Sequence, residues 1–178
     1  KRPMHVDVMA ESRVDAATDE AICHLQRRAF PATEEFRHGR YWIHRPGPDD
    51  LYVLAWQDDR LVGQTVLYQA TAPQGRLACL GNVCSDPDVR RGGYASACVR
   101  RALDEAGRLG VDWTLLFCAP ATVEFYRRLG FETVGNEVRF TRPDGSTRPH
   151  PPGDAAMVAA VSGRPWPDGP VVLDIDVF

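Results

Sequence analysis

The stretch Gly81–Ser96 constrains the fold more than any other part of the chain, because an apolar strand there runs through a glycine turn into a helix. Apolar residues recur at spacings of three and four after the turn, which predicts a helix from Gly93 to an end at Gly110. The pair Gly92-Gly93 lets the backbone approach a ligand closely. Free N–H groups at the positive end of the helix dipole predict a seat for a phosphate group.

Two blocks of the sequence carry a resemblance to a known family. The spacing of Arg90, Gly93 and Ala95 directly after a strand resembles the acyl-CoA diphosphate loop of the GCN5-related N-acetyltransferase (GNAT) superfamily. A second block, Ala121–Phe131, is similar to the short helix of that superfamily, in which an aromatic pair precedes Leu-Gly-Phe. With the helix and strand between the blocks, the resemblance covers residues 53–140.

The whole chain is expected to form one acyl-CoA N-acyltransferase domain from Met4 to Phe178. Its expected fold class is α/β (α+β), with a mixed, mostly antiparallel central sheet of about six to seven strands and about four flanking helices. Helices are predicted over 16–30, over 93–109 and within 121–131. Strands are predicted over 51–56, 61–70, 77–85, 113–119, 132–141, 155–161 and 171–178, the first two as a hairpin.

Charge and composition exclude several classes of protein. The formal net charge of −3 disfavours a nucleic-acid partner. No apolar run approaches the ~20 residues of a membrane span and the chain start lacks a signal-peptide core, so we expect a cytoplasmic protein without a membrane partner. The five widely spaced cysteines are expected to be small core residues rather than disulfide partners or metal ligands. Dimers are common in the family that the chain resembles, so a homodimer is one expected oligomeric state.

The resemblance implies that acetyl-CoA is the cofactor. In the family, the strand before the loop pairs with the pantetheine arm as another strand would, and the loop amides bind the diphosphate. The side chains matter little for this role, since backbone donors make the contacts. The residues expected to bind acetyl-CoA are Val83, Cys84, Ser85, Arg90, Arg91, Gly92, Gly93, Tyr94, Ala95 and Ser96.

Acetyl transfer to an amine needs a neutral amine, a donor for the oxyanion and a proton for the departing thiolate. The resemblance places the Tyr126 phenol beside the thioester sulfur, so Tyr126 is expected to be the general acid. A backbone N–H at Val83 or Cys84 is the expected oxyanion donor. The alternative for Tyr126 is a core aromatic residue that needs only one hydrogen-bond partner.

The general base is left open by the sequence. Many acetyltransferases of this type carry a glutamate on the strand before the loop, but Leu80–Val83 contains no carboxylate. The remaining candidates are Glu34, Glu35, His38, His44, Asp174 and Asp176. A solvated surface role is the ordinary alternative for each of the carboxylates.

The end of the chain points to a substrate class. The sequence Asp176-Val177-Phe178 is similar to the end of the aminoglycoside 2′-N-acetyltransferases, where an acidic residue and the chain-end carboxylate line the amine pocket. Strand alternation over 172–177 would place Asp174 and Asp176 on one face, and an ordinary exposed strand edge is the alternative. The residues expected to bind a cationic small-molecule amine are Glu34, Glu35, Asp174, Asp176 and Phe178.

Three functional hypotheses follow. The first is an acetyl-CoA-dependent N-acetyltransferase that modifies a primary amine of an aminoglycoside-type antibiotic by direct attack and so confers resistance. The second is an N-acyltransferase for another small-molecule amine or for a protein N-terminus, which the missing strand glutamate favours. The third is a non-catalytic CoA-binding domain, which would have no use for a proton donor at Tyr126.

Overall fold

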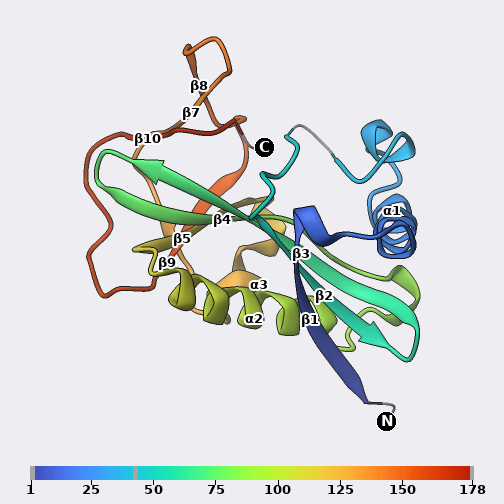
Figure 1. Ribbon diagram of the computed structural model, residues 1–178. Helices are drawn as coiled ribbons and strands as arrows, with labels where there is room; N and C mark the ends of the chain where they lie inside the picture. Colours follow the sequence, from blue (N-terminus) through green and yellow to red (C-terminus); the bar gives the residue numbers. More distant parts are fainter. Residues whose placement is uncertain (1–2, 42–43, 177–178) are drawn as a thin grey trace. The chain divides into compact units, whose positions relative to one another are not determined.

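The computed structural model describes residues 3–41 and 44–176 of the chain. Phe178, expected to line an amine pocket, lies outside the described residues. Two compact units make up the structure (Figure 1). The first combines the residues up to Tyr68 with Asn82–Ala102, and the second combines Gln69–Gly81 with the residues from Leu103 onward.

Antiparallel strands form the sheet of the first unit. They are β1 (Met4–Ala10), β2 (Leu51–Gln57) and the first part of β3 (Arg60–Ala72). β1 pairs with β2 along its whole length, and β2 pairs with β3 through a tight turn in which Asp58 has a positive φ of 55°. The predicted hairpin is therefore confirmed, whereas β1 has no counterpart among the predicted strands.

Helix α1 (Ala16–Ala29) confirms the helix predicted over 16–30 to within one residue. The Asp15 side chain caps its start by accepting a hydrogen bond of 2.8 Å from the Thr18 N–H, which satisfies one of the free donors of the first turn. Its apolar face is buried. After the helix, the chain makes the short 3₁₀ helix η2 (Glu34–Arg37) before it enters β2.

Helix α2 (Tyr94–Leu109) ends at Gly110, which adopts the left-handed conformation with a φ of 70°, as predicted. The first turn of α2 lies very close to β3. A Cβ atom added to Gly63 would come within 2.9 Å of the Tyr94 Cβ, so only glycine at this position of β3 permits the approach. The start of α2 is thus held firmly against the sheet.

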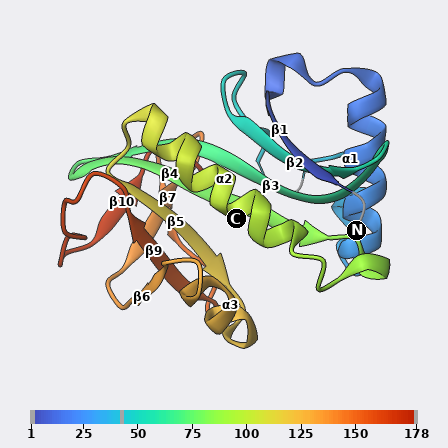
Figure 2. The same ribbon diagram turned by 90° about the horizontal axis from the view of Figure 1, so that it is seen from below.

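The second unit contains the strands that follow α2. The part of β4 (Gly75–Ser85) that belongs to this unit runs parallel to β5 (Trp113–Cys118), and β5 pairs antiparallel with β9 (Ala155–Ala160). β6 (Glu132–Val134) pairs antiparallel with the other side of β9, as Figure 2 shows. Along the hydrogen bonds, the strand order of the whole sheet is β1-β2-β3-β4-β5-β9-β6. This seven-stranded mixed sheet confirms the predicted α/β class.

A second sheet of three strands corrects the prediction for residues 132–141. It has the order β10-β7-β8, with β7 at Val138–Thr141, β8 at Thr147–Pro149 and β10 at Val171–Leu173. The single strand predicted over 132–141 is wrong, because the chain leaves the main sheet after β6. The Asn136 side chain donates hydrogen bonds to the carbonyl oxygens of Pro167 and Gly169, at 3.0 and 2.7 Å, and so ties this break to a distant loop.

The helical content is close to the expectation. Within residues 3–41 and 44–176 the structure has three α-helices, of which α3 (Val123–Arg127) is the shortest. Short 3₁₀ helices also occur at η1 (Glu11–Arg13), η3 (Pro87–Val89) and η4 (Pro120–Thr122). No helix in this part of the chain is long and apolar enough to cross a membrane.

Candidate functional site

The end of β4 departs from regular strand geometry where the pantetheine arm is expected. Asn82 has a φ of 51°, a left-handed conformation in the interior of a strand, which bends the backbone just before Val83. The fully buried Gln64 side chain donates a hydrogen bond of 3.2 Å to the Asn82 carbonyl and holds this bend. Val83 and Ser85 are partly exposed, so a ligand can reach the strand there.

The loop between β4 and α2 contains two residues in the left-handed conformation. Arg91 has a φ of 72° and Gly93 a φ of 79°. Between them, a Cβ atom on Gly92 would come within 2.3 Å of the Tyr94 ring, so any other residue there would displace this ring. Next to Gly93 an added Cβ would meet no atom within 4 Å. The glycine pair therefore shapes a turn whose outer side is open.

Four backbone donors face this turn without a protein partner. The first hydrogen bond at the start of α2 runs from the Ala97 N–H to the Gly93 carbonyl at 3.0 Å. The N–H groups before it have no acceptor in the part of the chain that the structure describes, and Gly93 has no side chain that could cap them. Such donors at the start of a 16-residue helix suit a diphosphate. They belong to Gly93, Tyr94, Ala95 and Ser96.

The N–H groups of Gly93 to Ser96 are available to a diphosphate, whereas the Gly92 N–H, also expected to bind acetyl-CoA, donates to the Val89 carbonyl at 3.2 Å. Arg90 and Arg91 are exposed at the mouth of the loop and add positive charge there. Cys84 is buried, and burial raises the pKa of its thiol far above the ordinary value. At neutral pH Cys84 is therefore an uncharged thiol, which is a poor nucleophile.

Tyr126 lies in the second unit, on α3, with 8 % of its surface exposed. Its ring packs edge-on against Phe125 and Phe131, with ring centroids 4.9 and 6.0 Å away. Its carbonyl accepts hydrogen bonds from the N–H groups of Leu129 and Phe131, at 2.9 and 3.2 Å. The Leu-Gly-Phe segment is thus the turn that ends α3, and the phenol belongs to an aromatic cluster.

The acidic residues near the chain end are engaged within the protein. The backbone of Asp174 donates to the Thr71 carbonyl at 3.0 Å, and its carboxylate accepts from the Thr71 N–H at 2.7 Å. Asp176 accepts a hydrogen bond of 2.6 Å from Arg148 Nε, which balances its charge. Because β10 ends at Leu173, the strand alternation expected over 172–177 is wrong.

The other candidate acids and bases lie on the segment between α1 and β2. Glu34 and Glu35 are both exposed on η2, and Glu34 makes an ion pair of 3.5 Å with Arg37. His38 is exposed after η2, while the His44 ring packs edge-on against Tyr68 at 5.8 Å. Glu34 and Glu35 therefore remain accessible to a cationic ligand.

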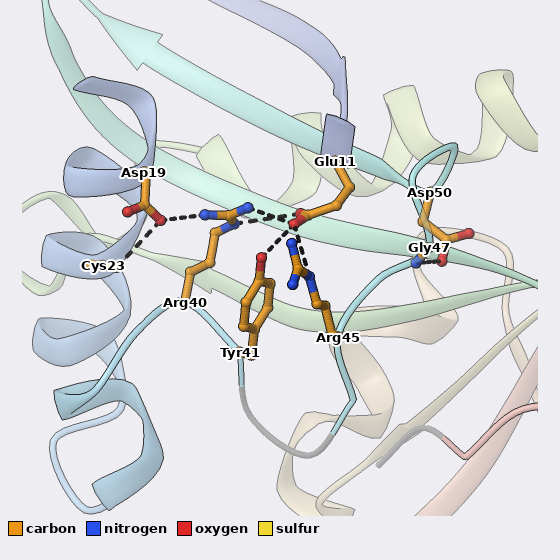
Figure 3. A network of polar contacts seen from close by, with 8 residues as sticks. All are labelled: Glu11, Asp19, Cys23, Arg40, Tyr41, Arg45, Gly47 and Asp50. Atoms are coloured by element: carbon orange, nitrogen blue, oxygen red, sulfur yellow. Dashed lines mark hydrogen bonds and ion pairs between the residues drawn. The ribbon is translucent and has the colours of Figure 1, made fainter. Parts of the chain in front are cut away.

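A buried ionic network organises this same segment, and its residues were absent from the sequence-based candidates (Figure 3). Glu11 has 6 % of its surface exposed and accepts hydrogen bonds of 2.5 Å from Arg40 Nη2 and from the Tyr41 hydroxyl. Arg40 also donates to Asp19 on α1 at 2.5 Å. Burial and the bond to Glu11 raise the pKa of the Tyr41 phenol. No motif signals this network, since its members are brought together only by the fold.

The network borders a pocket of about 560 Å³ in the first unit. Arg45 stands at this pocket with its Nε 4.0 Å from Glu11, while most of its side chain is exposed. The pocket thus combines one buried carboxylate with two guanidinium groups. Its lining residues are Glu11, Ser12, Val14, Arg40, Arg45, Pro46 and Pro48.

Comparison with protein families decides the assignment. Residues 20–131 match the model of the Acetyltransferase (GNAT) family. The chain belongs to the GNAT family. This GNAT protein is accordingly an acyltransferase that uses acetyl-CoA. No curated protein sequence gives a significant match to the chain.

Solved structures share the fold of this GNAT protein. An acyl-CoA N-acyltransferase from Pseudomonas aeruginosa is 18% identical with a TM-score of 0.66, over 89% of this chain and 100% of the other. FeeM, an N-acyl amino acid synthase from uncultured soil microbes, is 15% identical with a TM-score of 0.64, over 92% and 93%. The PaiA N-acetyltransferase from Thermoplasma acidophilum in complex with coenzyme A is 14% identical with a TM-score of 0.62, over 89% and 99%.

Proposed function

We propose that this GNAT protein transfers the acetyl group of acetyl-CoA to a primary amine of a small molecule, with an aminoglycoside-type antibiotic as the acceptor. The observation that carries the proposal is the set of four N–H groups at the start of α2, Gly93 to Ser96, that have no partner within residues 3–41 and 44–176. A helix start with free donors in this geometry binds phosphate oxygens without the help of side chains.

The proposed roles are those that the family resemblance implies. The backbone of Val83–Ser85 pairs with the pantetheine arm, and the N–H of Val83 or Cys84 donates to the oxyanion that forms on attack. Tyr126 gives its proton to the thiolate that departs when the carbon–sulfur bond breaks. The proton of the attacking amine leaves to a base, for which Glu34 and Glu35 are exposed candidates.

Direct attack by the amine is favoured over a route through an acylated cysteine. Cys84 is the cysteine on the strand expected to hold the pantetheine, and burial raises the pKa of its thiol. A thiol that stays protonated at neutral pH does not compete with a neutral amine for the acetyl carbon. We therefore assign the transfer to one step between bound acetyl-CoA and bound amine.

The aminoglycoside acceptor is supported by the similarity of the chain end to the aminoglycoside 2′-N-acetyltransferases and by accessible carboxylates. Glu34 and Glu35 are exposed and can make charge-assisted hydrogen bonds to ammonium groups of an amino sugar. Acetylation removes one positive charge from such an antibiotic, so resistance would follow from its weaker binding to an anionic target.

Another acceptor amine is the second candidate, and one specific observation favours it. Asp176, the acidic residue closest to the chain end, already pairs with Arg148 and offers less net charge to a polycation. A monoamine, an amino acid or a protein N-terminus would need fewer acidic contacts than an aminoglycoside.

The test is an acetyl-transfer assay with a panel of acceptors. The protein is incubated with acetyl-CoA and with aminoglycosides, polyamines, amino acids or peptides, and the release of free thiol is followed. Thiol release with aminoglycosides alone is the expected result. Thiol release with amino acids or peptides alone would mean that the acceptor belongs to that class and is not an aminoglycoside. CoA binding without thiol release for any amine would indicate a non-catalytic domain.

A further inference from the structure

A buried carboxylate lies immediately before the loop that carries the proposed diphosphate seat. The Asp86 side chain is only 3% exposed, although it follows the last residue of β4. Arg28 from the last turn of α1 reaches it at 3.2 Å, and Arg60 at the start of β3 also donates to it. Two guanidinium groups from distant parts of the sequence thus balance this carboxylate.

Asp86 also fixes the backbone on both sides of itself. Its N–H donates to the Val62 carbonyl of β3 at 2.8 Å, and its carboxylate accepts from the Asp88 N–H at 2.9 Å. Its carbonyl accepts from the Val89 N–H at 3.1 Å, and the Val89 carbonyl in turn accepts from the Gly92 N–H at 3.2 Å. A continuous series of hydrogen bonds therefore runs from β3 through Asp86 to the glycine pair.

This series ends just before the first turn of α2. Gly92 is its last member, and the four N–H groups that follow, from Gly93 to Ser96, have no acceptor among the described residues. Because the loop includes two left-handed residues, it needs contacts outside itself to keep one conformation. The buried, doubly paired carboxylate of Asp86 supplies such contacts.

We propose that Asp86 is a positioning residue for acetyl-CoA, which holds the loop in the conformation that directs the Gly93–Ser96 amides at one diphosphate. It acts through Arg28 and Arg60, which anchor it to α1 and β3. The inference rests on the proposed diphosphate seat and adds to it a residue that touches neither the diphosphate nor the reacting atoms.

The experiment measures CoA binding by calorimetry for the wild type and for Asp86→Asn, together with the thermal midpoint of each protein without ligand. Asp86→Asn should bind CoA about tenfold more weakly, the equivalent of about 1.4 kcal/mol. With any acceptor that is turned over, its KM for acetyl-CoA should rise while kcat at saturation stays unchanged. A residue with a purely structural role would lower the thermal midpoint but leave the affinity of the folded protein unaltered.

Asp88→Asn is the matched control, because Asp88 is 66% exposed and pairs with the same arginine, Arg28, at 2.6 Å. It should leave CoA binding within about twofold of the wild type. If Asp86→Asn fails to fold, Arg60→Gln is the second variant. It removes one ion-pair partner of Asp86 whose own side chain is 49% exposed, and it should weaken CoA binding about threefold.

The outcomes separate the two proposals. A wild type that does not bind CoA refutes the diphosphate seat itself. A wild type that binds CoA, with Asp86→Asn and Arg60→Gln binding it equally well, refutes the positioning role alone. Equal losses for Asp88→Asn and Asp86→Asn would also refute it, since they would indicate a general effect of surface charge.

Discussion

Replacing Glu11 with glutamine should lower the free energy of unfolding by about 3 kcal/mol, because it removes the anion of a buried ionic network. The Glu11 side chain is 5% exposed and that of its partner Arg40 is 13% exposed. After the substitution, Arg40 keeps only the ion pair with Asp19, whose side chain is 43% exposed. The nearly buried Arg40 guanidinium then contacts one carboxylate instead of two.

The magnitude follows from these contacts. Removal of one partner from a buried ion pair typically costs about 3 to 5 kcal/mol. The lower end applies to Glu11, because Arg40 retains Asp19 and because a glutamine oxygen can still accept from the Tyr41 hydroxyl. For a chain of this size, the loss corresponds to a fall in Tm of about 6 to 12 °C.

Urea denaturation followed by circular dichroism measures this loss, with Glu34→Gln as the control. Glu34 also pairs with an arginine, Arg37, but their side chains are 78% and 63% exposed, so its removal should cost less than about 0.5 kcal/mol. A loss below about 1 kcal/mol for Glu11→Gln would refute the reasoning, since the buried pair would then behave like a surface pair.

Three further predictions concern the reaction and its pH range. Tyr126→Phe should lower kcat about a hundredfold with little change in the KM for acetyl-CoA, and unchanged steady-state turnover would remove Tyr126 from the acid role. Asp176→Asn should raise the KM for a cationic acceptor, whereas an unchanged KM would leave Asp176 only as the partner of Arg148. Since the folded-state pKa of Tyr41 is raised, its stabilising effect is complete below the unfolded pKa of about 10 and is lost as the pH rises through the folded value. Urea midpoints measured up to about pH 11 should therefore fall less steeply for Tyr41→Phe than for the wild type, and parallel curves would contradict this assignment.

The elements around the proposed cofactor seat could be predicted from the sequence because their signals are local. Gly93 adopts a positive φ that favours glycine, and the apolar spacing that follows the glycine pair defines α2. β1 was missed because this strand at the sheet edge depends on its pairing with β2. The division of 132–141 into β6 and β7 was missed for a similar reason, since Asn136 bonds to a loop about thirty residues further along.

The cofactor site and the acceptor site of the proposed reaction differ in the same way, because only the cofactor site is specified by local sequence. The cofactor side uses backbone N–H groups, which a glycine turn and a helix start specify whatever the neighbouring side chains are. The acceptor side depends on which charges stay accessible after folding, and these depend on contacts between distant residues. Asp176 is matched by Arg148 and Glu11 by Arg40, whereas Glu34 and Glu35 stay exposed. The sequence thus identifies acetyl-CoA as the acetyl donor. The acceptor amine must be inferred from the charged side chains that stay accessible in the folded protein.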